Sequence, residues 1–128
     1  MKLRIKDSSI RLRLTQTEVA SLAAGQDVHG LLKLGPTSRD CLAYGITISS
    51  TVDHISAHCF TGSLLVTLPL PLARKWHESP TVGLQATQSV DDGQEVTVLL
   101  EKDFTCLHRG PGENDSDTFP NPAKAGAI

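Results

Sequence analysis

The chain has 128 residues, 39% apolar and 20% charged, a composition that suits one compact domain and is too small for two separate cores. Its 12 Lys and Arg residues face 14 Asp and Glu residues, and the net charge of -2 disfavours duplex nucleic acid and anionic membranes as partners. No apolar run approaches the roughly 18 residues of a membrane-spanning helix. The opening residues do not have the pattern of a signal peptide, and the three cysteines are widely spaced, so we expect a cytoplasmic protein with reduced thiols.

Alternation of apolar and charged residues predicts two strands at the start of the chain, over residues 3–5 and 10–14. The apolar positions change parity across residues 7–9, which predicts a turn and a hairpin, with a bulged single strand as the alternative. Thr15 and Glu18 have the spacing of a capping box, and Gly25 is suited to a helix stop. We therefore predict a helix over Thr15–Ala24, followed by a weaker strand over residues 28–34.

The rest of the chain predicts five further strands and one short helix. Two prolines end the third of these strands, and the second proline suits the first turn of a helix. The expected elements are strands over 41–49, 55–60 and 63–68 as a meander, a helix over Pro71–His77, and strands over 82–90 and 95–100 joined by a turn at 91–93.

These elements predict an α+β fold with a mostly antiparallel sheet of six to eight strands and two short helices; closure into a barrel is an open alternative. Residues 1–122 are expected to form a single domain and residues 123–128 a disordered tail. Near the end of this domain, residues 110–117 have the composition of a loop, and residues 119–122 that of an extended anchor. No internal repeat is visible.

The most unusual charge pattern lies in the first 13 residues, which hold five of the 12 cationic residues. If the two opening strands pair, these side chains share one face of the sheet. Arginine can hold phosphate or carboxylate groups through two hydrogen bonds, so this face is a candidate anion site. The alternative interpretation is a solvated face, or an edge strand guarded by charge. The candidate anion-binding residues are Lys2, Arg4, Arg11 and Arg13, with Lys6 beside them.

A second charge cluster, Glu101, Lys102 and Asp103, follows an apolar strand. Alternation directs Glu101 and Asp103 to one face, where they could meet Arg11 and Arg13 as structural ion pairs, and Lys102 to the other. An active site is the competing interpretation of this cluster.

Metal, cofactor and nucleophile signals are weak. The candidate zinc ligands do not form short pairs, and the acidic loop lacks the pattern of a calcium site. We also find no phosphate-binding loop, dinucleotide fingerprint or nucleophile elbow. We therefore expect no metal and no cofactor, and assign no catalytic residue. The residues weighed are His54, His58, Cys59, Cys106 and His108 for zinc, and Glu113, Asp115 and Asp117 for a hard cation.

Four segments stand in a characteristic order: SIRLRLTQTEV at 9–19, residues 68–76, EKDFTCL at 101–107 and FPNP at 119–122. In this order they resemble a family of small uncharacterised bacterial proteins, a domain of unknown function. The resemblance covers nearly the whole chain and implies a stand-alone bacterial cytoplasmic protein. It implies no ligand, catalytic residue or partner.

The sequence thus favours a small binding or interaction module without a catalytic motif, with a small anion or a protein as its partner. The alternative is an enzyme acting on a small anionic substrate, a phosphate or carboxylate, through the basic strand face and the nearby carboxylates.

Overall fold

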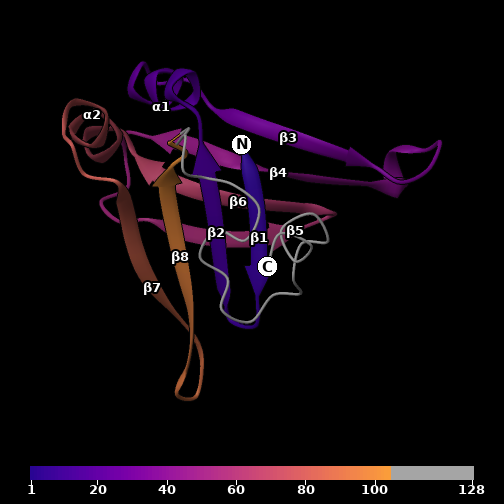
Figure 1. Cartoon of the computed structure of the whole chain (residues 1–128). Coiled ribbons are helices and arrows are strands. Elements are labelled where there is room, and N and C mark those ends of the chain that lie inside the picture. The colour runs from indigo at the N-terminus through magenta and orange to yellow at the C-terminus, as the bar shows by residue number, and fades with distance from the viewer. Residues whose placement is uncertain (105–128) are drawn as a thin grey trace, which may run out of the picture.

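The computed structural model describes residues 1–104, as two four-stranded sheets and two helices (Figure 1). The elements in chain order are β1 (Lys2–Lys6), β2 (Ser9–Leu14), α1 (Gln16–Ala23), β3 (Val28–Lys33), η1 (Ser38–Asp40), β4 (Cys41–Ser49), β5 (Ser56–Phe60), β6 (Ser63–Pro69), α2 (Leu70–Glu78), β7 (Gly83–Asp91) and β8 (Gln94–Lys102). The expectations for Cys106, His108, the acidic loop, the 119–122 anchor and the 123–128 tail lie outside the described residues.

Sheet A has the strand order β1-β2-β8-β7, and sheet B the order β3-β4-β6-β5. The central pairs β2–β8 and β4–β6 are parallel, and the four outer pairs are antiparallel. The α+β class, the opening hairpin and the mostly antiparallel pairing are confirmed. In the described part of the chain the strands form two separate sheets and no closed barrel.

The predicted meander of β4, β5 and β6 is wrong, because β4 pairs with β6 and leaves β5 at the edge. Burial explains this order: Val66 and Leu68 of β6 are completely buried, whereas the last three residues of β5 are exposed. A strand with a fully buried apolar face is best placed between two neighbours, and a half-exposed strand at the edge.

An internal repeat that is not visible in the sequence relates the two halves of the described chain. Hairpin, helix and hairpin follow one another from β1 to β4, and again from β5 to β8. The first hairpins match at an offset of 54 residues, and their turns share a left-handed backbone, with φ 49° at Asp7 and 47° at Thr61. Corresponding buried residues are Leu12 and Val66, Leu14 and Leu68, and Leu22 and Trp76. They share apolar character but not identity, which conceals the repeat.

The two repeats are interlocked. Each sheet combines the first hairpin of one repeat with the second hairpin of the other, joined by the parallel central pair. In Figure 1 the strands of the two sheets cross steeply, and α1 and α2 lie side by side at one end. The apolar inner faces of both sheets and the helices share one core, whose fully buried residues include Leu14, Leu22, Ile46, Leu68, Val98 and Leu100.

Both helices begin where a core strand ends. The predicted capping box is confirmed: the Glu18 N–H donates to Thr15 Oγ1 at 3.2 Å, and the Thr15 N–H donates to Glu18 Oε1 at 2.9 Å. The N-terminal amino group lies 2.8 Å from Glu18 Oε2. Burial acts to raise the pKa of Glu18, but the hydrogen bonds from the amino group and Thr15 outweigh it and lower the pKa overall. Gly25, at φ 87°, ends α1 as predicted. Neither helix of the described chain is long and apolar enough to span a membrane.

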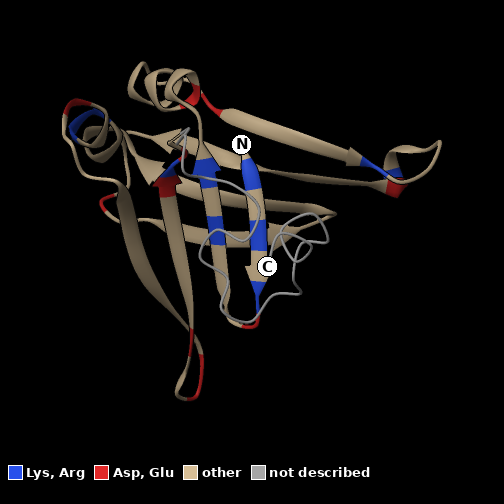
Figure 2. Cartoon of the chain, in the orientation of Figure 1, with Lys and Arg blue, Asp and Glu red and all other residues tan. Residues whose placement is uncertain are grey.

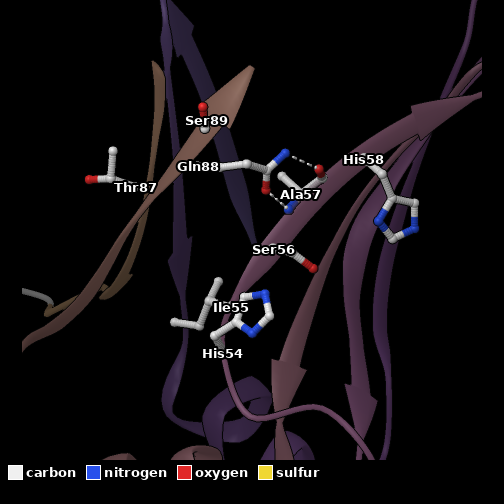
Figure 3. A pocket seen from close by; sticks show the side chains of 8 residues that line it. All are labelled: His54, Ile55, Ser56, Ala57, His58, Thr87, Gln88 and Ser89. Atoms are coloured by element: carbon white, nitrogen blue, oxygen red, sulfur yellow. Dashed lines mark hydrogen bonds between the residues drawn. The ribbon is translucent and has the colours of Figure 1, made fainter. Parts of the chain in front are cut away.

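A single glutamine side chain closes the corner where the edge strands β5 and β7 meet. The Ala57 N–H donates to Gln88 Oε1 at 2.8 Å, and Gln88 Nε2 donates to the Ala57 carbonyl at 2.7 Å (Figure 3). The amide therefore takes the place of a fifth strand beside β5.

Replacement of Gln88 by leucine is expected to lower the free energy of unfolding by about 1–3 kcal/mol, because it leaves the partly buried Ala57 N–H and C=O without partners. Chemical denaturation measures the loss. Gln85→Leu is the control, because Gln85 is an exposed residue of the same strand and its replacement should stay within about 0.5 kcal/mol. Equal effects of the two replacements would show that the Gln88 hydrogen bonds do not stabilise this corner.

Candidate functional site

The four predicted anion-binding residues surround one hollow on the outer face of sheet A. The hollow has a volume of about 130 Å³ and is lined by Lys2, Arg4, Arg11 and Arg13. Figure 2 shows the cationic residues as bands along the neighbouring strands β1 and β2. Strand alternation explains the placement, because the residues between them turn their apolar side chains to the core.

The strand register brings like charges directly opposite each other. Lys2 is the partner of Arg13, and Arg4 is the partner of Arg11. Like charges in opposite positions of an antiparallel pair are destabilising. The face therefore favours negatively charged groups that can lie between the cations.

Two carboxylates of the predicted charge cluster supply part of that negative charge. Glu101 Oε1 lies 3.3 Å from Arg11 Nε and 3.4 Å from Arg13 Nε, and Asp103 Oδ2 lies 3.3 Å from Lys2 Nζ. Glu101 thus meets both arginines of β2, as predicted, whereas Asp103 meets Lys2 of β1. Five cations thus share a face with two carboxylates, and within residues 1–104 no ion pair is formed by Arg4 or Lys6.

Lys102 points to the other side of sheet A, as alternation predicts. Its Nζ donates to the Ser79 carbonyl at 2.7 Å and lies 5.9 Å from the centroid of the Trp76 ring. These contacts tie the end of β8 to the end of α2. Lys102 is therefore a structural residue and takes no part in the basic face.

The repeat offers an internal comparison for the basic face, since sheet B has structurally equivalent positions. At the offset of 54 residues, Arg4 corresponds to His58 and Arg11 to Leu65. The fold therefore does not require cations at these positions. Edge protection also fails to explain Arg11 and Arg13, because β2 lies between two strands. The positions equivalent to Lys2, Arg4, Lys6, Arg11 and Arg13 hold Ser56, His58, Phe60, Leu65 and Thr67.

A second hollow, of about 420 Å³, lies at the β5–β7 corner, around residues 54–58 and 87–89 (Figure 3). Among the described residues that line it, the titratable side chains are those of His54 and His58. His54 Nδ1 lies 2.7 Å from Asp53 Oδ1, and the hydrogen bond from His54 lowers the pKa of Asp53. Both side chains are exposed to water, so the pair is a surface contact.

In the described part of the chain, no three His, Cys, Asp or Glu side chains converge as metal ligands would. His58 and Cys59 are consecutive residues of β5, so they point to opposite faces, as the extended sequence predicts. The expectation of no metal remains a prediction, because Cys106 and His108 lie outside the described residues.

The comparison with known protein families bears on nearly the whole chain. The profile of a family of unknown function (DUF7009) matches residues 1–123. The chain belongs to this family. This match agrees with the family resemblance that the order of the four sequence segments indicates. The family has no assigned activity. No curated protein matches the chain, and no solved structure does.

Proposed function

We propose that this protein is a binding module that holds a small anionic group, a phosphate or carboxylate, on the basic face of sheet A. The hollow between Lys2, Arg4, Arg11 and Arg13 carries the proposal. Within residues 1–104, its cations outnumber the carboxylates that reach them, and a bound anion would relieve the repulsion between the opposed like charges. Arginine supplies the paired donors that fit such a group.

Binding is favoured over catalysis by the condition of the nearby carboxylates. Glu101 is engaged by two arginines and Asp103 by Lys2. A general base needs a carboxylate that can reach the substrate and accept its proton. Carboxylates held in ion pairs are better suited to positioning the arginines. We further propose that the protein acts in the bacterial cytoplasm and that residues 1–122 form one domain.

Replacement of Arg4 by glutamine is expected to weaken the binding of inorganic phosphate about tenfold or more, because a hydrogen bond to a charged group contributes about 1.5–3 kcal/mol. Glu101→Gln should act in the opposite direction. It removes the negative charge that competes for Arg11 and Arg13, so affinity should rise up to about fivefold, while stability falls by up to about 1 kcal/mol without phosphate. Titrations followed by NMR and thermal melts measure these effects.

Arg39→Gln is the matched control, since Arg39 is an exposed arginine of η1 and makes no ion pair in the described chain. Equal losses for Arg4→Gln and Arg39→Gln would show that phosphate responds only to total charge and would refute the site. Tight binding of duplex DNA with a steep salt dependence would also contradict it, since each neutralised phosphate contributes about -0.9 to the slope.

A further inference from the structure

One row of backbone groups in β1 faces away from sheet A. The carbonyls of Ser8 and Leu14 accept hydrogen bonds from the N–H groups of Thr97 and Asp103, so the even-numbered residues of β2 face β8. The N–H and C=O groups of the odd-numbered residues of β2 must then form their hydrogen bonds with the backbone of Lys2, Arg4 and Lys6 in β1. The N–H and C=O groups of the alternate residues, Leu3 and Ile5, consequently point outward from the edge.

The repeat shows how the corresponding edge is closed on sheet B. Ala57 corresponds to Leu3, and the Gln88 amide occupies both of its backbone groups. The position in β3 that corresponds to Gln88 is Leu32, whose side chain has no amide and is 47% exposed. Within residues 1–104, the backbone groups of Leu3 and Ile5 receive no hydrogen bond from outside the β1–β2 pair. Among residues 1–104, the Gln88 side chain caps the edge of β5, and no residue caps the edge of β1.

The charged side chains along the β1 edge determine which strands can pair with it. Lys2, Arg4 and Lys6 alternate along β1 on the outer face, and Ile5, 59% exposed, lies on the other side. A second copy of β1 in antiparallel pairing would place these cations opposite one another, which is unfavourable. A strand with carboxylates at alternate positions would place opposite charges there instead. The edge therefore rejects its own copy and favours an acidic strand.

We propose that an extended acidic peptide with carboxylates at alternate positions binds beside β1 and adds a fifth strand to sheet A. The proposal rests on the proposed anion-binding function and names the partner class for the same face. The backbone of Leu3 and Ile5 supplies the hydrogen bonds, and Lys2, Arg4 and Lys6 supply the charge selection. Binding in this mode depends on the spacing of the carboxylates along the peptide as well as on their number.

The test titrates the full-length chain with two synthetic peptides of equal composition. One, TEVEVET, alternates its glutamates, and the other, TVEEEVT, places them together. We expect the alternating peptide to bind at least tenfold more tightly and to slow hydrogen exchange of the Leu3 and Ile5 amides at least tenfold. Equal affinities, or unchanged exchange at saturation, would overturn the strand-addition proposal, and absence of phosphate binding would instead overturn the proposed function.

Ile5→Pro separates the strand addition from anion binding. It removes an outward N–H that takes no part in the β1–β2 pairing, and edge strands tolerate proline at such positions. The peptide affinity should fall at least tenfold while phosphate affinity stays within twofold. Ile5→Thr, which keeps the N–H, should leave both unchanged. An undiminished peptide affinity in a folded Ile5→Pro variant would refute the proposal, and if that variant does not fold, the wild-type exchange measurement decides.

The chain itself carries carboxylates at alternate positions 113, 115 and 117. A triple variant, Glu113→Gln with Asp115→Asn and Asp117→Asn, tests whether these residues are the occupant of the edge. A peptide affinity within threefold of wild type supports a separate peptide as the partner. A rise of more than tenfold would show that the chain's own carboxylates compete for the edge and would overturn that assignment.

Discussion

Separation of the chain after Thr51 should abolish folding of both fragments as monomers. The cut falls in the exposed connection between β4 and β5 and removes no strand, but it divides both sheets. Each fragment keeps two hairpins and one helix and loses the parallel partner of its central strands. Six residue pairs of β2–β8 and seven of β4–β6 join the halves, together with the shared core. Without them each hairpin exposes its apolar face, which isolated hairpins cannot sustain.

Circular dichroism and sedimentation of each fragment measure this loss, and an equimolar mixture is the positive control. The mixture should recover the native signal and unfold cooperatively, because the two halves together contain every strand pair. A single fragment that folds cooperatively as a monomer would contradict the interlocked arrangement. It would show that one repeat can close its own core.

Trp76→Ala should have the largest effect of any single replacement in α2, about 3–5 kcal/mol of lost stability. Trp76 is 1% exposed, lies at the position equivalent to Leu22 of α1, and packs where the two helices meet. Its removal opens a cavity and takes away the ring beneath the Lys102 ammonium group. The loss is offset in part, because Trp76 Nε1 is buried and has no hydrogen-bond partner within the described residues.

Chemical denaturation compares this variant with His77→Ala, the adjacent and exposed residue of the same helix. The control carries the same change in helix propensity at a surface site and should stay within about 0.5 kcal/mol. A loss below about 1 kcal/mol for Trp76→Ala would show that the helix pair contributes little to the core.

The duplicated architecture gives the two sheets different surfaces on equivalent backbones. Sheet B closes its β5 edge with Gln88 and holds no lysine or arginine at the positions equivalent to the basic face. In the described part of the chain, sheet A has no such cap on the β1 edge and gathers five cations on β1 and β2. The core needs neither the open edge nor the cations, since the equivalent half is built without them.

Local signals in the sequence predicted the elements themselves. Alternation located the strands, the Thr15–Glu18 capping box and Gly25 bounded α1, and Asp7 marked the first turn. Alternation also predicted which face each charged residue of β1, β2 and β8 occupies, because side chains alternate along any strand whatever its neighbours. The shared face of the four residues of the basic hollow was predicted by this rule together with the expected pairing of the two opening strands.

Only the tertiary structure decided how the strands assemble. The parallel pairs β2–β8 and β4–β6 join residues far apart in the chain, and no local pattern specifies which apolar strand lies beside which. The repeat was concealed because core positions conserve burial and tolerate exchange of one apolar residue for another, as Leu22 and Trp76 illustrate. The closed edge at Ala57 and the open edge at Leu3 likewise follow from assembly, since a backbone group is capped only where folding places a partner.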